Sequence, residues 1–160
     1  MHAVFTSYSP VNSRVVERDT GEVLYNITTP LSVLLHETTM YDGRGHAIAT
    51  YRRQVGPDEI TYRGETRYVS DWLCKEDLFS RTRMLTAPNG RKYRWEDLLG
   101  RSKFRLVDCE TGEVVAEAYG SLFGILADPR NMGIEVSDAG VEILDVIVLS
   151  FIILEKERRD

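Results

Sequence analysis

The sequence predicts a mainly β fold of antiparallel hairpins that ends in a buried apolar helix. Turn signals recur at short intervals between β-rich runs, which is typical of antiparallel sheets. One long apolar stretch occupies residues 141–154. The chain has 160 residues, 42% of them hydrophobic, which is the size of one domain and enough for one well-filled core. We therefore expect a single domain over residues 1–160, with strands within 1–137 and a helix over about 141–157.

Two hairpins of the same type are predicted far apart in the chain. The β-rich runs 14–18 and 22–27 flank Asp19-Thr20-Gly21, and the runs 104–108 and 113–118 flank a turn that ends in Thr111-Gly112. Glycine at the last turn position suits the left-handed backbone that closes such a hairpin. The repeat is either a trace of internal duplication or two independent uses of one turn. Further turns are expected at Asp42-Gly43-Arg44-Gly45 and Pro88-Asn89-Gly90.

Residues 70–79 interrupt the β pattern. Ser70 and Asp71 are residues that cap helices, and they precede Trp72, Leu73 and the apolar pair at 78–79. We expect a short helix or helical turn here, laid over an open end of the sheet.

The apolar stretch at 141–154 fits either a buried strand or a helix, because its periodicity does not separate the two. Length favours a helix of roughly 16 residues, about 24 Å long. Basic residues follow at 156–159, where they complement the helix dipole, although the many β-branched residues oppose a helix. A helix that is apolar on every side must be surrounded by protein.

The order and spacing of several short segments resemble an uncharacterised family from mushroom-forming fungi, the domain of unknown function 6593. The matching segments run from about Leu24 to Arg158 and are Leu24-Tyr25-Asn26-Ile27, Ile48-Ala49, Asn89-Gly90-Arg91-Lys92-Tyr93-Arg94-Trp95, Val115-Ala116, Leu144-Asp145-Val146-Ile147-Val148, Phe151, Leu154-Glu155 and Arg158. The pattern is also similar to the tubby-like group, which includes phospholipid scramblases and LURP-one-related plant proteins. This resemblance implies a closed antiparallel β-barrel of about 12 strands around a central C-terminal helix. It brings a lipid-handling precedent and no catalytic residue.

Motifs for cofactor, metal or nucleophilic chemistry are not recognisable. The three histidines, His2, His36 and His46, lie in no known ligand or catalytic spacing, and neither a phosphate loop nor an aspartate-rich calcium loop occurs. We expect no cofactor and no metal. Cys74 and Cys109 lack C-x-x-C spacing and suit a reducing compartment. Without a signal peptide or an apolar run of about 20 residues, we expect a cytoplasmic protein with no transmembrane segment.

Charge is distributed unevenly along the chain. The net charge is −5, which argues against a general nucleic-acid binder that must neutralise many phosphates. Residues 44–105, however, hold 14 basic and 8 acidic residues, a balance of +6, and the remainder therefore carries −11. This basic middle segment is the positive functional signal in the sequence.

Strand alternation groups the basic residues of this segment. Residues two apart on a strand share a face. The basic residues that are spaced in this way would lie on one outer face of the sheet. They are Arg81, Arg83, Lys92, Arg94, Arg101, Lys103 and Arg105. Tyr93, Trp95, Phe104 and Leu106 would then face the opposite side. The basic face would attract phosphoinositide head groups or an anionic membrane, at about 1 kcal/mol per charge. Alternatively, it is an ordinary solvated exterior whose acidic partners lie on neighbouring strands.

The sequence therefore predicts a non-enzymatic binding or scaffold domain with an anionic lipid or membrane surface as its ligand. One alternative is a cofactor-independent enzyme or small-ligand carrier with a pocket at the barrel mouth, lined by His36, His46 or clustered carboxylates. A second alternative is a protein-interaction module that oligomerises through exposed sheet edges.

Overall fold

A computed structural model describes residues 1–32, 35–98, 103–120 and 132–160. In these residues, thirteen strands form one antiparallel sheet in the order β7-β6-β5-β4-β3-β2-β1-β13-β12-β11-β10-β9-β8. The strands are β1 (His2–Phe5), β2 (Ser13–Glu17), β3 (Val23–Thr28), β4 (His36–Asp42), β5 (Ala47–Arg53), β6 (Glu59–Tyr62), β7 (Glu65–Tyr68), β8 (Cys74–Lys75), β9 (Arg83–Thr86), β10 (Lys92–Asp97), β11 (Lys103–Asp108), β12 (Val114–Tyr119) and β13 (Gly133–Val136). The helices are α1 (Val69–Trp72), α2 (Asp138–Val141) and α3 (Leu144–Arg159).

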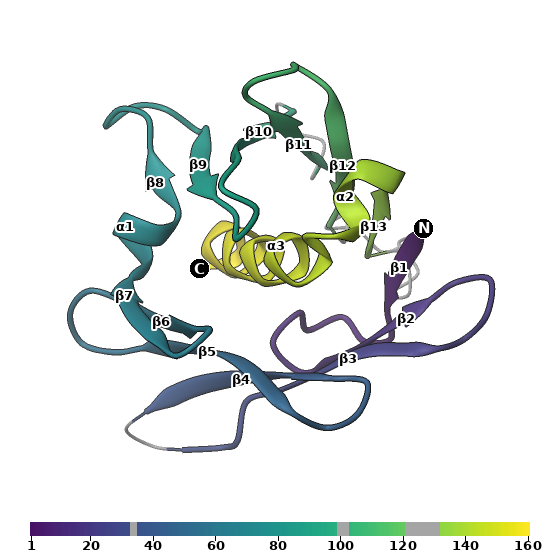
Figure 1. Cartoon of the computed structure of the whole chain (residues 1–160). Coiled ribbons are helices and arrows are strands. Elements are labelled where there is room, and N and C mark those ends of the chain that lie inside the picture. Colours follow the sequence, from purple (N-terminus) through teal and green to yellow (C-terminus); the bar gives the residue numbers. More distant parts are fainter. Residues whose placement is uncertain (33–34, 99–102, 121–131) are drawn as a thin grey trace.

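The sheet curls around α3 (Figure 1). Pairing of β1 with β13 joins the first seven strands to the last six, so the two terminal strands of the sheet are β7 and β8. These two strands are not paired with each other, and α1 lies between them in contact with both. The prediction of a mainly β architecture around a C-terminal helix is confirmed. The ring differs from a closed barrel at this one place, which we call the seam.

The two predicted Thr-Gly hairpins have the same construction. Gly21 and Gly112 both have a φ of 73°, the left-handed conformation expected from the sequence. In each turn a carboxylate accepts backbone N–H groups: Glu17 from Asp19 and Thr20, and Asp108 from Glu110 and Thr111. The turn residues therefore satisfy their own backbone donors, and each turn fixes the register of its strands.

The short helix or helical turn expected near residues 70–79 is present as α1, which ends at Trp72. α1 is a single turn, and Cys74 and Lys75 instead pair with β9 as the short strand β8. Pairing with β9 gives the backbone N–H and C=O groups of both strands hydrogen-bond partners. A further helical turn at Cys74 and Lys75 would leave β9 without these partners. Trp72 and Leu73 are buried as expected, whereas the apolar residues at 78–79 are exposed.

The C-terminal helix is the centre of the core. Every residue from 146 to 155 is buried, and the ring of Phe151 meets the rings of Phe5, Trp95 and Phe104. The polar Ser150 is also buried, and its hydroxyl accepts a 2.8 Å hydrogen bond from Trp95 Nε1 and donates to the Val146 carbonyl oxygen at 2.7 Å. Burial on all sides thus overrides the low helix propensity of the β-branched residues. No helix among the described segments is long and apolar enough to cross a membrane.

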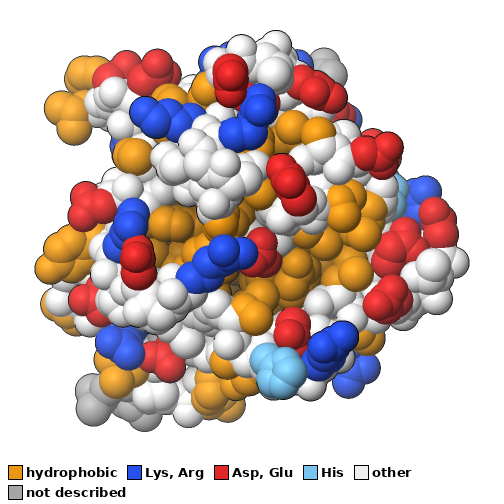
Figure 2. Space-filling view, viewed as in Figure 1, with side chains coloured by type: hydrophobic (Ala, Val, Ile, Leu, Met, Phe, Trp, Pro, Cys, Tyr) orange, Lys and Arg blue, Asp and Glu red, His pale blue; other side chains and the backbone are white. Residues whose placement is uncertain are grey.

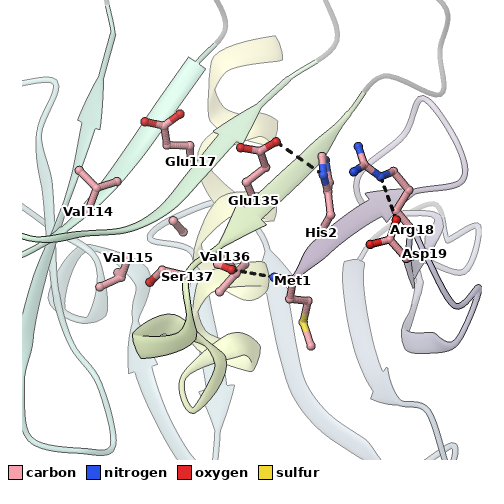
Figure 3. Close-up of a pocket in the computed structure, with 11 residues that line it drawn as sticks. Met1, His2, Arg18, Asp19, Val114, Val115, Glu117, Glu135, Val136 and Ser137 are labelled. Atoms are coloured by element: carbon pink, nitrogen blue, oxygen red, sulfur yellow. Dashed lines mark hydrogen bonds and ion pairs between the residues drawn. The ribbon is translucent and has the colours of Figure 1, made fainter.

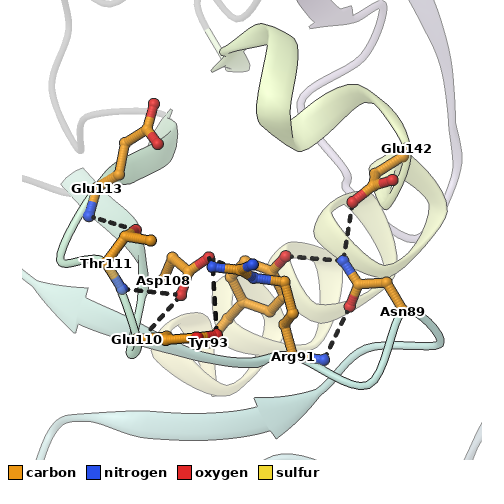
Figure 4. A network of polar contacts seen from close by, with 8 residues as sticks. All are labelled: Asn89, Arg91, Tyr93, Asp108, Glu110, Thr111, Glu113 and Glu142. Atoms are coloured by element: carbon orange, nitrogen blue, oxygen red, sulfur yellow. Dashed lines mark hydrogen bonds and ion pairs between the residues drawn. The ribbon is translucent and has the colours of Figure 1, made fainter.

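The ends of α3 define two mouths of the curled sheet. At the N-terminal mouth, where α3 begins, Tyr62 donates a 2.5 Å hydrogen bond to Asp145, and Asn89 donates to Glu142 at 2.9 Å. Figure 4 shows how the second contact continues into a polar network, in which Arg91 pairs with Asp108 at 2.7 Å. At the C-terminal mouth, where α3 ends, Arg53 pairs with Asp160 and Arg83 with Glu157. Polar contacts therefore fix both ends of an otherwise apolar helix.

Replacement of the central ring of α3 tests this description of the core. Phe151→Ala should lower the free energy of unfolding by about 3–5 kcal/mol, because it leaves a cavity where three aromatic rings converge. Urea denaturation followed by circular dichroism measures the change. Val141→Ala, at an exposed position in α2, is the control and should change stability by less than about 1 kcal/mol. Equal effects of the two substitutions would contradict the central role of α3.

Candidate functional site

The predicted basic residues separate into two groups. Lys92 and Arg94 on β10, and Lys103 and Arg105 on β11, lie on the outer face of the sheet, because the residues that alternate with them are buried. Arg83 is in register with the buried Trp95 and so lies on the inner side, where its guanidinium meets Glu157 of α3 at 3.0 Å. Arg101 lies outside the described residues.

Carboxylates engage most of these cations. Arg94 and Arg105 both bind Glu96, at 2.9 and 2.8 Å, and Arg81 lies 3.8 Å from Asp97. Hydrogen bonds from Arg94 and then Arg105 hold the pKa of Glu96 below its ordinary value. Among the described residues, no carboxylate pairs with Lys92 or Lys103. Figure 2 accordingly shows basic and acidic side chains interspersed across the face that it displays.

The C-terminal mouth carries exposed apolar side chains. Five large ones are each more than half exposed, and we call them the apolar rim: Leu31, Leu35, Val55, Leu78 and Phe79. They belong to the β3–β4, β5–β6 and β8–β9 connections. Because neighbouring strands are antiparallel, these alternate connections all lie at the end of the sheet where α3 ends. Leu31 and Val55 are fully exposed, and Phe79 is 96% exposed.

A pocket of about 340 Å³ lies beside the rim. Leu78 and Phe79 form part of its wall together with Phe104 and Leu154, and Arg81 and Arg83 supply charge. The two arginines keep their carboxylate partners there, Asp97 and Glu157. Lys75 and Arg158 also line this pocket, and Arg158 pairs with Glu155. The pocket therefore combines an apolar wall with mostly paired cations, which suits contact with an amphiphilic surface.

The N-terminal mouth is built differently. Its connections include tight turns closed by positive-φ glycines such as Gly90 and Gly112. The exposed apolar residues at this end, Met1, Val23 and Val141, are each less than half exposed. Among the described residues, large apolar side chains that are more than half exposed therefore occur at the C-terminal mouth and not at the N-terminal mouth.

A second pocket, of about 470 Å³, lies on the outer face of β1, β12 and β13 (Figure 3). His2 Nε2 is 2.7 Å from the Tyr119 hydroxyl, and His2 Nδ1 is 3.6 Å from Glu135. Burial raises the pKa of Tyr119, so its hydroxyl stays protonated at neutral pH and is a poor nucleophile. The described residues contain no group of three histidines, cysteines or carboxylates arranged to hold a metal.

The other two histidines do not line this pocket. His46 hydrogen-bonds the turn residue Asp42, and His36 is exposed on β4. The carboxylates of Asp19, Glu117 and Glu135 do lie along the pocket, as the small-ligand alternative requires. They line an open surface depression rather than a mouth of the sheet.

The sequence pattern does not predict the apolar rim. It places Leu78 and Phe79 in the segment expected to be a short helix or helical turn, and Leu31 and Val55 are isolated apolar residues in polar surroundings. The available signal was their position: Leu31 follows Pro30, and Val55 precedes Gly56-Pro57. Such turn residues interrupt the strand alternation that would otherwise bury an apolar side chain.

The fold and these surfaces together define a class of domain in which one antiparallel sheet encloses its own C-terminal helix. Within that class, the chain belongs to a family described as a family of unknown function (DUF6593), whose model matches residues 8–160. The chain is similar to an X-ray structure of a protein from Arabidopsis thaliana, AT5G01750, with a TM-score of 0.58 and 15% sequence identity. That likeness covers 98% of this chain and 90% of the plant chain, and it is one of fold. No curated protein matches the chain.

Ion pairs on the outer face and at the N-terminal mouth predict a loss of stability in acid. Arginine contacts lower the pKa of Glu96. Burial by itself would raise the pKa of Asp108, but N–H groups of Glu110 and Thr111, together with Arg91, outweigh it and lower that pKa. A carboxylate with a depressed folded-state pKa stabilises the fold above its unfolded pKa of about 4. That stability is lost as the pH falls through the folded-state pKa.

We therefore expect a nearly constant free energy of unfolding from about pH 7 to 5 and a decline below about pH 4. Urea denaturation across this range measures it. Glu96→Gln should lower stability by about 1 kcal/mol at pH 7 and flatten the acid decline, because both arginines lose their charged partner. Glu113→Gln, at an exposed turn position, is the control. An unchanged acid profile in the Glu96 variant would contradict the assignment.

Proposed function

We propose that residues 1–160 form a single binding domain that docks on the cytoplasmic face of a membrane through its C-terminal mouth. The observation that carries the proposal is the apolar rim: all described large apolar side chains that are more than half exposed lie at this one end. These exposed side chains, gathered at one end of the domain though not contiguous, support an interaction surface there. The free thiols of Cys74 and Cys109 support a reducing compartment.

A lipid surface fits the rim better than a protein partner. The five side chains stand on three separate connections, and charged residues such as Arg53 and Asp160 lie where α3 ends beside them. Separate apolar tips fit poorly into the contiguous, well-packed core of a stable protein interface. A fluid membrane interface accepts each tip independently. Full burial of one such side chain contributes about 1.5–3 kcal/mol, so five partly inserted tips would give weak, reversible attachment.

Basic residues at the same mouth extend the proposal to anionic lipids, including phosphoinositides. Lys103 begins β11 at this end and has no carboxylate partner among the described residues, whereas Arg81, in the β8–β9 connection, lies 3.8 Å from Asp97. An unpaired charge such as that of Lys103 contributes about 1 kcal/mol near an anionic surface. Arg83, Arg94 and Arg105 are held by carboxylates, so they contribute less than the sequence alone suggested.

The apolar part of the proposal is tested by removing two adjacent tips. The double variant Leu78→Ser/Phe79→Ser should bind phosphatidylcholine–phosphatidylserine vesicles at least about tenfold more weakly, because both side chains are exposed and would insert. Vesicle co-sedimentation measures binding, and the melting temperature should not fall. The control Val23→Ser/Val141→Ser removes two apolar residues from the opposite mouth and should bind like the unmodified chain. Equal binding by the two double variants, or no vesicle binding by the unmodified chain, would refute the proposal.

The electrostatic part is tested with two lysines at opposite ends of their strands. Lys103→Gln should weaken binding to anionic vesicles about fivefold at low salt, whereas Lys92→Gln, at the N-terminal mouth, should not. Raising the salt concentration to about 1 M should abolish the difference, because screening removes the contribution of an exposed charge. Identical losses from the two substitutions would favour a basic outer face over docking through the mouth.

A further inference from the structure

The seam of the sheet contains a pocket of about 370 Å³ beside α1. Residues of β6, the β6–β7 turn, β7, α1, the end of β9 and the segment after it line the pocket, among them Ile60, Tyr62, Arg63, Arg67 and Trp72. It is separate from the apolar rim, because Tyr62 is tied to Asp145 at the beginning of α3. The pocket exists where the sheet fails to close, since α1 fills only part of the space between β7 and β8.

Two aromatic side chains form an apolar, angled wall of the pocket. The rings of Tyr62 and Trp72 meet edge to face, with centroids 6.4 Å apart and an interplanar angle of 62°. Burial, followed by the hydrogen bond to Asp145, raises the pKa of Tyr62 to about 12. The hydroxyl of Tyr62 therefore stays neutral and occupied, and its ring is held in a fixed position. Such a wall suits a planar ring better than a flexible polar group.

One cation of the pocket has no anionic partner. The guanidinium of Arg63 lies 5.7 Å from the centroid of the Tyr62 ring, and no carboxylate among the described residues pairs with it. The neighbouring Arg67, in contrast, is neutralised by Glu65 at 2.6 Å. An arginine presents its donors in a planar fork that matches a carboxylate. Arg63 is therefore the group of this pocket that is available to bind an anion.

Arg63 also occupies an unfavourable backbone conformation. Its φ is 52°, and it precedes Gly64 with a φ of 78°, which is the two-residue hairpin turn that prefers Asn-Gly. Among the described residues, Arg63 is the only non-glycine with a positive φ. Residues held in such backbone conformations lower stability, and they cluster at binding and active sites, where the strain is retained because the residue has a function. The turn directs the one unpaired arginine of the pocket to the aromatic wall.

We propose that the seam pocket binds a small planar aromatic carboxylate, with its ring against Trp72 and Tyr62 and its carboxylate on Arg63. The volume is at the small end of the range for ligand sites, which fits one or two fused rings. This site does not depend on membrane docking, and its ligand approaches from solvent at the seam.

Isothermal titration calorimetry with 1-naphthoate as the probe tests the proposal, and the neutral 1-naphthalenemethanol is the matched ligand. The unmodified chain should bind 1-naphthoate at least tenfold more tightly than the alcohol. Arg63→Asn should reduce 1-naphthoate binding at least tenfold and raise the melting temperature by about 2–4 °C, because asparagine is favoured in this turn. Loss of binding together with a gain in stability is a result that simple damage to the fold does not produce.

Arg44→Asn is the control, because Arg44 lies in another tight turn and does not line the pocket. It should leave 1-naphthoate binding within twofold of the unmodified chain. Three results would each overturn the proposal: no binding of 1-naphthoate at millimolar concentration, equal binding of the acid and the alcohol, or full binding by the Arg63→Asn variant. Vesicle binding by the Arg63→Asn variant should be unchanged. A negative result for 1-naphthoate would therefore not bear on the membrane-docking proposal.

Discussion

The whole structure depends on covering a helix that is apolar on every side. Residues 146–154 of α3 are all buried and, apart from Ser150, apolar, so no face of this part of the helix can be left to solvent. A flat sheet covers one side of a helix only, and a sheet that surrounds α3 must therefore curl through nearly a full turn. Thirteen strands provide most of that ring, and α1 occupies part of the remaining gap at the seam (Figure 1). The alternation of buried and exposed residues in β10 and β11 is the local consequence, because one side of each strand must face α3.

The sequence was sufficient for features that depend on local patterns. Glycine turns, the C-terminal helix and the inward direction of Tyr93, Trp95, Phe104 and Leu106 all follow from residue type and alternation, and the structure shows each of them. Features that depend on pairing between strands could not be predicted. Glu96 neutralises Arg105 because they are opposite each other in the β10–β11 register, and Cys74 joins a strand because β9 offers partners. The open seam is likewise a property of the complete sheet, and no local sequence pattern predicts it.

The two mouths of the sheet differ because their connections differ. Tight turns at the N-terminal mouth keep side chains close to the strands, whereas the β3–β4, β5–β6 and β8–β9 connections extend apolar residues beyond them. The proposed membrane surface and the seam pocket consequently lie on different parts of the domain. A membrane at the C-terminal mouth would leave the seam pocket accessible, so a domain of this shape could hold a small ligand and a lipid surface at the same time.

The position of α3 in the chain also determines when the protein can fold. Every strand of the sheet is synthesised before the helix that fills it, and β1 must wait for β13, about 130 residues later, before the ring is joined. Until α3 leaves the ribosome, the inner faces of the strands have no partner and resemble the exposed surfaces that chaperones recognise. A chain interrupted before residue 144 would keep all its hairpins and lack the surface on which they pack. The appearance of α3 is thus itself the step that makes the sheet stable.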